Sequence, residues 1–238
     1  MSTEDAATRI DANPTRETRS ASTPGQRRPE AATTVTGRAT KLRIRDAASE
    51  LFFERGYQAT TMREIATAAG VRAGSLYNHY DNKEDLLLSI ASETMEEMID
   101  GGRAAVAEHD DATAKLYAFL GFHIAYTGER KFQARVADDF LHILSPQARR
   151  SVVRLRDDYE AILRAILTQG ARQSGWLVDD IALIAFGIVT MSTDIRLWFR
   201  PDGRLNLGDI TRFYSRFVLR ALGDADPTLR AVAPTGSI

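Results

Sequence analysis

The chain has 238 residues, of which 44% are hydrophobic and 26% are charged, and it contains no cysteine. Such a composition is typical of a globular protein with a substantial core, and the absence of cysteine excludes disulfides and thiolate zinc sites. The first residues lack the apolar segment of a secretory signal, and no run of about eighteen uniformly apolar residues suggests a membrane span. We therefore expect a cytoplasmic protein without a membrane partner.

Charge is unevenly distributed along the chain. Residues 1–83 contain 13 Lys and Arg against 10 Asp and Glu, whereas residues 84–238 contain 18 against 22. The basic first third slightly favours a polyanionic partner for the N-terminal part.

Both ends of the chain are expected to lack fixed structure. Residues 1–37 are rich in Thr, Ser, Ala, Pro and Arg and have few large apolar side chains. Folding them would bury too little surface to offset the entropy that is lost. We predict a disordered tail over 1–37 and a flexible C-terminal tail over 224–238.

Helical patterns begin after this tail. Apolar residues between Leu42 and Phe52 recur at intervals of three and four, which predicts a helix over 40–55. Thr61 and Glu64 have the spacing of a capping box, which predicts the start of a second, short helix.

A third short helix is expected over 73–80, and Asp81 or Asn82 can cap a fourth helix that begins at Lys83. The second and third helices are joined by the turn "AAGV" and braced by the longer first helix. This arrangement predicts a helix-turn-helix module over 38–84.

The remainder of the chain also shows only helical patterns. No alternating run of β-branched residues indicates a strand, so the predicted fold class is all-α, with about nine helices in total. Glycine, proline and aspartate mark the breaks between helices. Beyond the long fourth helix, five more are expected, approximately over 111–127, 131–144, 146–174, 179–200 and 207–222, within a second domain over 85–223.

The stretch "AGSLYNHY", residues 73–80, gathers groups that also occur in active sites. A hydrolase would need a base beside Ser75, but His79 lies on the same short helix and no strained glycine turn surrounds the serine. A metal site would need a second ligand at helical spacing from His79, and the nearest acidic residues, Glu84 and Asp85, do not have that spacing. We therefore expect neither catalysis nor metal binding here.

Helical geometry instead predicts that several of these side chains are exposed. Leu76 completes the small core of the module, but the positions around it cannot all face the same core. Exposed hydroxyl, amide and aromatic groups beside basic residues are typical of a surface that meets DNA phosphates and base edges. Phosphate donors are expected at Tyr77, Tyr80 and Lys83, groups able to read bases at Ser75 and Asn78, and close backbone approach at Ala73 and Gly74.

The segment "ATTMREIATAAGVRAGSLYNHYDNKEDLL" resembles the DNA-binding signature of the tetracycline-repressor (TetR) family of transcription regulators. The resemblance spans about residues 40–88 and implies that residues 73–79 enter the major groove. It also implies phosphate contacts from Thr61, Tyr77, Tyr80 and Lys83, whereas His79 packs against a neighbouring helix or touches the DNA backbone.

Arg72 departs from the family pattern, which commonly has a capping serine or threonine at this position. The departure puts in doubt the N-cap of the helix expected over 73–80, which we call the recognition helix. It also suggests an extra contact from Arg72 to a phosphate or a guanine. The complete predicted DNA-binding set is Lys41, Thr61, Arg72, Ala73, Gly74, Ser75, Tyr77, Asn78, His79, Tyr80 and Lys83.

A dimer is expected through the last two long helices. Apolar residues between Ile181 and Trp198 recur at heptad-like intervals, and further apolar residues on other faces make this helix too apolar for the surface of a monomer. The family resemblance also implies a dimer at this position, and a two-fold dimer reads a pseudo-palindromic operator. The predicted interface residues are Ile184, Ile188, Met191, Ile195, Phe213 and Phe217.

The middle helices hold candidates for an effector pocket, although residues at such helical spacing belong to an ordinary core more often than to a ligand site. The segment from Asp194 to Leu222 is similar to that of family members that control lipid and steroid breakdown and sense acyl-CoA thioesters. Acyl-CoA is therefore one candidate effector. The predicted pocket residues are Phe119, Phe122, His123, Tyr126, Phe140, Leu144, Tyr159, Ile162, Phe186 and Arg196.

We interpret the sequence as that of a homodimeric, ligand-released repressor that binds double-stranded operator DNA. No catalytic residue, metal site or cofactor other than the effector is predicted. The alternative is a helical small-molecule carrier or interaction protein in which the three-helix module only packs. The salt dependence of DNA binding distinguishes a DNA-binding repressor from such a carrier, because the affinity of a DNA-binding protein for DNA falls steeply as the salt concentration rises.

Overall fold

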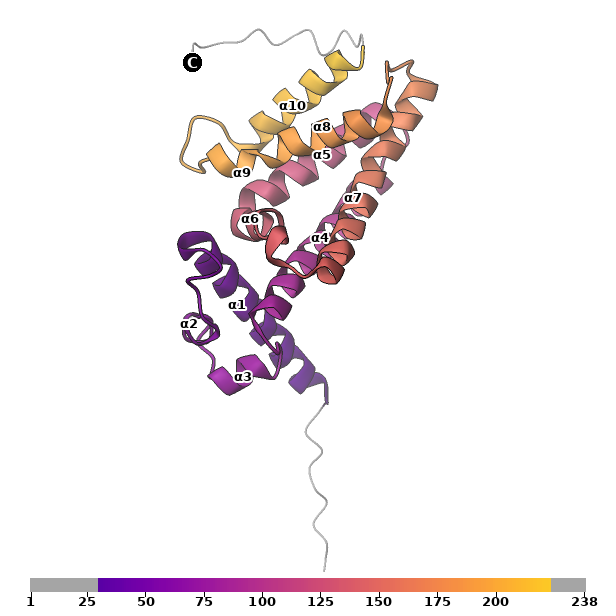
Figure 1. The fold of residues 1–238 in the computed structure, drawn as a ribbon. Helices are drawn as coiled ribbons and strands as arrows, with labels where there is room; N and C mark the ends of the chain where they lie inside the picture. The colour runs from indigo at the N-terminus through magenta and orange to yellow at the C-terminus, as the bar shows by residue number, and fades with distance from the viewer. Residues whose placement is uncertain (1–29, 224–238) are drawn as a thin grey trace, which may run out of the picture.

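The computed structural model describes residues 30–223, and these form helices without a single strand (Figure 1). This confirms the all-α class. The described residues form ten α-helices and one short 3-10 helix. In chain order they are α1 (Glu30–Arg55), α2 (Met62–Ala68), α3 (Ala73–Tyr77), α4 (Lys83–Ala107), α5 (Ala112–Glu129), α6 (Lys131–Asp139), η1 (Leu141–Ile143), α7 (Pro146–Gln173), α8 (Ile181–Thr193), α9 (Ile195–Trp198) and α10 (Leu207–Ala221).

Helices α1, α2 and α3 form a small unit at one end of the molecule, which we call the head (Figure 1). Its core consists of apolar side chains from each helix, including Phe52 of α1, Ile65 of α2 and Leu76 of α3, all fully buried. Gly70, with a φ of 64°, forms the turn between α2 and α3, and this left-handed conformation favours glycine. The predicted helix-turn-helix is therefore present.

Helix α4 connects the head to the rest of the protein. It begins at Lys83, where the Asp85 amide donates to the Asn82 side chain at 2.9 Å. From there it runs away from the head and packs along α7 (Figure 1). Its buried face carries apolar residues along most of its length, so any shift of α4 is felt in both the head and the bundle.

The remaining helices form a bundle around α5. Helices α8 and α10 both pack against α5 and lie at the end of the molecule opposite the head (Figure 1). Close approach of α10 depends on Gly128 of α5, because a Cβ atom there would lie 2.5 Å from the side chain of Leu207. This packing fixes α10 against the bundle.

The prediction of disorder over 1–37 is wrong for residues 30–37, which belong to α1. That prediction considered only the small amount of apolar surface. Once residues 40–55 form a helix, however, adding further turns costs little, and Glu30 and the alanines beside it favour helix. The disorder predicted for 1–29 and 224–238 lies outside the described residues.

Three predicted helices end or break earlier than expected. The recognition helix ends at Tyr77 rather than at residue 80, and the helix predicted over 131–144 becomes α6 followed by η1. The helix predicted over 179–200 is interrupted at Asp194, where Leu197 N donates to the Asp194 carbonyl at 3.0 Å, a tighter turn than in an α-helix.

Candidate DNA-binding surface and effector cavity

The entry into α2 is fixed by the predicted capping box. The Glu64 amide donates to Thr61 Oγ1 at 3.3 Å, and the Thr61 amide donates to Glu64 Oε2 at 2.8 Å. Hydrogen bonds from the Thr61 side chain and backbone lower the pKa of Glu64. Thr61 is exposed where α2 begins, and its hydroxyl donates to Glu64 Oε2 at 2.7 Å, so its contact with a phosphate stays a prediction.

The surface of α3 matches the expected exposure. Leu76 is fully buried, whereas Tyr77 is 53% exposed and Gly74 has open space where a Cβ atom would stand. Ser75 is half-buried, and the other exposed residues of the predicted set on this side are Ala73, Asn78 and His79. The helix therefore presents small, hydroxyl, amide and aromatic groups outward, and their contacts with DNA stay predictions.

Arg72 occupies the N-cap of α3 with extended backbone angles, and its side chain makes no capping hydrogen bond. The doubt raised by the sequence about this cap is thus confirmed. Arg72 is exposed and directly precedes α3.

Two residues of the predicted DNA-binding set make contacts within the protein instead. The Tyr80 side chain is only 3% exposed, and burial raises its pKa, so the prediction that its hydroxyl meets a phosphate is wrong here. Tyr80 follows α3 and turns inward beside Leu76 to complete the core. Lys41 of α1 forms an ion pair with Glu93 of α4 at 2.5 Å, so a carboxylate of the protein already neutralises its charge.

Lys83 connects the start of α4 to the loop between α1 and α2. Its ammonium group donates to the carbonyl oxygens of Tyr57 and Thr60 at 2.7 and 2.8 Å and lies 4.3 Å from the centre of the Tyr57 ring. Partial burial lowers its pKa. Lys83 therefore has a structural role in holding the head, and its phosphate contact stays a prediction.

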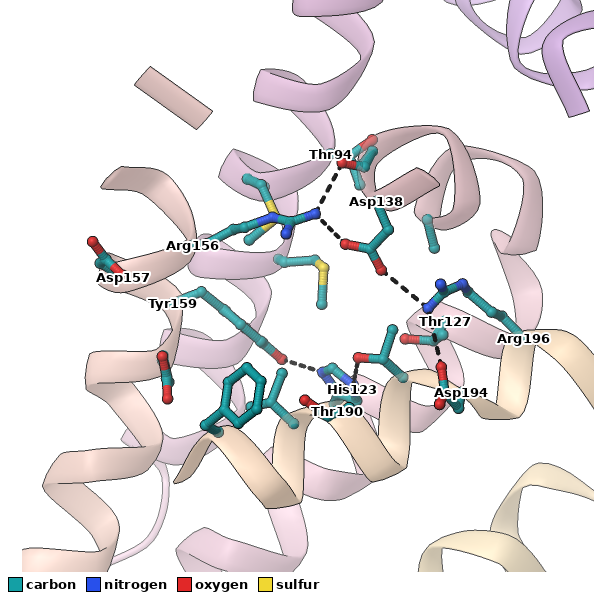
Figure 2. A pocket seen from close by; sticks show the side chains of 18 of the residues that line it. Thr94, His123, Thr127, Asp138, Arg156, Asp157, Tyr159, Thr190, Asp194 and Arg196 are labelled. Atoms are coloured by element: carbon teal, nitrogen blue, oxygen red, sulfur yellow. Dashed lines mark hydrogen bonds and ion pairs between the residues drawn. The ribbon is translucent and has the colours of Figure 1, made fainter. Parts of the chain in front are cut away.

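A cavity of about 410 Å³ lies in the bundle between α4, α5, α6, α7, α8 and α9 (Figure 2). This volume falls within the range of roughly 300–1,000 Å³ that is common for small-molecule sites. Apolar side chains such as Met95, Met98 and Val189 line part of the wall, and hydroxyl, imidazole and charged groups line the rest.

Four of the ten predicted pocket residues line this cavity: His123, Tyr159, Phe186 and Arg196. The other six do not, and the prediction is wrong for them. Phe119, Phe122, Tyr126, Leu144 and Ile162 belong to the core packing around the cavity, and Phe140 packs against the head. Periodicity identified them as inward-facing, but it cannot tell a wall of a cavity from solid core.

His123 of α5 is 1% exposed and is held between two hydroxyl groups. Its Nδ1 lies 2.9 Å from Tyr159 Oη, and its Nε2 lies 3.0 Å from Thr193 Oγ1. Burial lowers the pKa of His123 from 6.5 to about 4, so the imidazole is neutral at physiological pH. The Tyr159–His123 contact is visible in Figure 2.

At the other side of the cavity, Asp138 of α6 lies between Arg156 of α7 and Arg196 of α9 (Figure 2). Arg196 Nη1 is 3.0 Å from Asp138, and the same guanidinium group also reaches Asp139 at 3.3 Å and Asp194 at 3.5 Å. Burial raises the pKa of Asp138, although both arginines oppose that effect.

Sequence reasoning missed most of the polar cavity wall. Thr94, Thr127, Asp138, Arg156 and Thr190 stand on five different helices and share no motif. Only the helix packing brings them together. Only Asp138 and Arg156 could have been noticed in the sequence. Each is a charged residue that interrupts the apolar side of its helix.

Buried polar and aromatic contacts join the bundle to the head. Arg45 of α1 is 2% exposed and donates to Glu97 of α4 at 2.5 Å, and Tyr126 of α5 donates to the same carboxylate at 2.8 Å. Burial pushes the pKa of Glu97 up, but these hydrogen bonds outweigh it and the pKa is lowered. Phe140, after α6, packs 6.4 Å from the ring of Phe52 in the head.

An exposed apolar surface covers parts of α8, α9 and α10. Phe213 and Phe217, both predicted for the dimer interface, are 66% and 51% exposed and stack on each other. The prediction is wrong for Ile188 and Ile195, which are buried in the protein's own core, and Ile184 and Met191 also pack against that core. The exposed large apolar side chains of α8 and α9 are instead Leu183, Phe186, Leu197 and Trp198.

The window Ile181–Trp198 has a mean hydropathy of 1.5, so it is long and apolar enough to cross a membrane by those two measures alone. It is not a uniformly apolar run, so the expectation from the sequence is not contradicted. The window is split between α8 and α9 and contains the ion-paired residues Asp194 and Arg196.

The protein resembles known regulators along most of its length. Residues 44–90 match the family described as "Bacterial regulatory proteins, tetR family", and residues 109–222 match the "Tetracyclin repressor-like, C-terminal domain". The transcriptional repressor KstR2 of Rhodococcus jostii RHA1 is 29% identical over 78% of this chain and 91% of its own. The fatty acid metabolism regulator protein of Bacillus subtilis is 30% identical over 70% of this chain and 87% of its own.

Among solved structures, AibR in complex with isovaleryl coenzyme A and operator DNA is 27% identical and superposes with a TM-score of 0.65. The match covers 77% of this chain and 98% of AibR. These likenesses extend through both the head and the bundle, so they remove the alternative of a carrier with an incidental three-helix module. The chain therefore belongs to the TetR family, and it is a DNA-binding transcription regulator rather than an enzyme.

Proposed function

We propose that this protein is a cytoplasmic repressor that binds a pseudo-palindromic operator as a two-fold dimer and leaves the DNA when an acyl-CoA thioester fills the cavity. The observation that carries the proposal is the position of α4. This helix begins at the helix-turn-helix, and its residues Thr94, Met95 and Met98 form part of the cavity wall.

Operator binding is assigned to the outward face of α3. The groups that reach phosphates and bases come from Tyr77 and Asn78 and from Ala73 and Gly74 at the start of α3. Arg72 adds a cation beside them. Two such faces, related by the two-fold axis of a dimer, read two half-sites about one helical turn of DNA apart.

Release follows from the contacts between the bundle and the head. A ligand between α4, α6 and α7 changes the position of α4 and α6, and these helices are tied to α1 through Glu97 and Phe140. The separation of the two α3 helices then differs between the ligand-bound and the DNA-bound protein. Effector and DNA oppose each other's binding by the same factor.

The choice of acyl-CoA rests on the cavity and on the relatives. The cavity combines an apolar wall with polar groups, as a short acyl chain with a thioester requires. AibR was solved with isovaleryl coenzyme A and operator DNA, and one relative is named as a regulator of fatty acid metabolism.

The test is a titration of the protein bound to DNA from upstream of its own gene. Fluorescence anisotropy of labelled DNA would follow isovaleryl-CoA, octanoyl-CoA and steroid-derived acyl-CoA, with free coenzyme A as the control. Release by at least one thioester and not by coenzyme A supports the proposal. Stable DNA binding in the presence of every thioester contradicts it.

A further inference from the structure

The polar part of the cavity has hydroxyl donors that the protein itself does not use. We propose that the cavity recognises a neutral hydrogen-bond acceptor, such as a thioester, ester or ketone carbonyl, through Thr94 and the chain Tyr159–His123–Thr193, and that it discriminates against a free carboxylate. This inference rests on the proposed function and specifies the chemistry of the effector.

The chain Tyr159–His123–Thr193 always leaves one hydroxyl proton available. A neutral imidazole carries one proton, either on Nδ1 or on Nε2. If Nδ1 carries it, His123 donates to Tyr159 and accepts from Thr193, so the Tyr159 hydroxyl proton is free. If Nε2 carries it, His123 donates to Thr193 and accepts from Tyr159, so the Thr193 proton is free. The two contacts are 2.9 and 3.0 Å, which permits both arrangements.

All three members of this chain line the cavity, and they reach it from α5, α7 and α8. A ligand acceptor near either hydroxyl can therefore select the tautomer that donates to it. The chain adapts to the ligand without moving a side chain, and it supplies one donor in either state.

Thr94 supplies a second donor. Thr94 is 1% exposed and lines the cavity, and its Oγ1 atom is buried without a hydrogen-bond partner among the described residues. A buried hydroxyl that forms no hydrogen bond costs free energy, and an acceptor on a ligand removes that cost. Thr94 therefore offers a hydroxyl donor at the cavity wall that no group among the described residues uses.

Charge argues against a free carboxylate as that acceptor. Four carboxylates line the cavity, Asp138, Asp157, Glu160 and Asp194, against two guanidinium groups, Arg156 and Arg196, and Arg164 outside the lining pairs with Glu160 at 3.7 Å. Both lining arginines are already paired with carboxylates of the protein, Arg196 with three of them. A carboxylate inside the cavity would add a negative charge where negative charge already dominates.

Two probes of the same size isolate this effect. Octanoic acid and 2-nonanone carry the same heptyl chain on a carbonyl, which bears a hydroxyl in the acid and a methyl in the ketone. The acid is ionised at pH 7.5, and the ketone is neutral. Isothermal titration of the purified full-length protein without DNA is expected to show 2-nonanone binding at least about tenfold more tightly than octanoate.

Substitutions test the named donors. Thr94→Val keeps the shape of the side chain and removes the hydroxyl, so the affinity for 2-nonanone should fall about three- to tenfold. Thr168→Val is the matched control, because Thr168 lies on α7 outside the cavity and its hydroxyl donates to the Arg164 carbonyl. It should change the affinity less than about twofold.

The hydroxyl chain has a signature of its own in a double-mutant cycle. Either Tyr159→Phe or Thr193→Val alone leaves one tautomer that still offers a hydroxyl proton, so each should weaken 2-nonanone binding less than about threefold. The two changes together remove both hydroxyl donors and leave only the N–H of the His123 ring, so the loss of 2-nonanone affinity should exceed the product of the two single losses. Circular dichroism of each variant checks that the protein is folded.

The outcomes separate the two proposals. Octanoate binding as tightly as 2-nonanone, or no binding of 2-nonanone to the wild-type protein, overturns the inference whatever happens to the variants. If the loss of 2-nonanone affinity in the double variant equals the product of the losses in the two single variants, the proposed role of Tyr159–His123–Thr193 is overturned. If 2-nonanone binds as expected but no thioester releases the DNA, the inference stands and the proposed function fails.

Discussion

His123 makes the stability of the fold depend on pH. In the unfolded chain its pKa is near 6.5, whereas burial in the folded protein lowers the pKa to about 4. The unfolded state therefore takes up a proton first as the pH falls. The contribution of His123 to stability is complete above pH 6.5 and is lost as the pH falls towards 4, by about 3 kcal/mol in total.

Urea unfolding of the wild-type protein and of His123→Asn, measured at pH 7.5 and at pH 4.5, tests this point. The asparagine does not titrate and can keep one of the two hydrogen bonds. The free energy of unfolding should fall less on acidification in the variant than in the wild type. An equal fall in both would mean that His123 is not the group that is responsible.

Arg72 combines a weak structural role with a favourable position for DNA. Its side chain does not cap α3, so Arg72→Ser should add a capping hydrogen bond and raise the free energy of unfolding by about 1 kcal/mol. The same change removes a cation beside the recognition face and should weaken operator binding about tenfold. Measured on one preparation, the substitution should raise the free energy of unfolding and lower the affinity for the operator. Unchanged DNA affinity would remove Arg72 from the interface.

At the scale of elements, the contact of α6 and its following residues with α1 connects the cavity to the head. Phe140 packs against Phe52, and Gln133 of α6 donates to Asp46 of α1 at 3.0 Å. Phe140→Ala should lower the free energy of unfolding by about 2 kcal/mol, because a partly buried ring is lost. It should also reduce the effect of octanoyl-CoA on operator affinity while leaving octanoyl-CoA binding within a few-fold of wild type.

Phe122→Ala is the matched control for this coupling. Phe122 is also partly buried in the bundle, but it does not line the cavity, and it packs against α4 at Gly101, farther from the head than the cavity-lining residues Thr94 to Met98. A similar loss of stability without a loss of coupling is expected. If both variants respond to octanoyl-CoA like the wild type, the contact at Phe140 does not transmit the signal.

Elements were predictable where the cause is local. The capping box at Thr61 and Glu64 and the glycine turn at Gly70 follow from neighbouring residues, and both were recognised in the sequence. Burial of Tyr80 and the cavity position of Thr94 depend instead on how distant helices pack. Helical periodicity states which side of a helix is apolar, but it does not state which neighbour that side meets.

At the scale of the whole molecule, the exposed apolar surface on α8, α9 and α10 requires a partner. Contiguous exposure of large apolar side chains is unusual for a monomer, and here it includes Phe213 and Phe217. Introducing charge with Phe213→Glu and Phe217→Glu together should produce monomers, because both rings are already exposed and the fold does not depend on them. Size-exclusion chromatography with light scattering measures the mass.

The control for the interface is Leu42→Glu, an exposed apolar residue on α1 in the head. It should leave the dimer intact. Monomeric Phe213→Glu/Phe217→Glu protein should also bind the operator more weakly, since two linked heads bind with a high effective concentration. A double variant that remains dimeric would place the interface on another surface.

The central claim, that the outward face of α3 binds DNA, is tested most directly by the salt dependence of operator affinity for wild type and Tyr77→Ala. Tyr77 is 53% exposed, so the substitution should not disturb the core of the head. We predict that wild-type affinity falls steeply between 50 and 200 mM salt, on the order of a hundredfold or more, and that Tyr77→Ala weakens binding about tenfold at each concentration. Equal affinity of the two proteins for the operator would contradict the account.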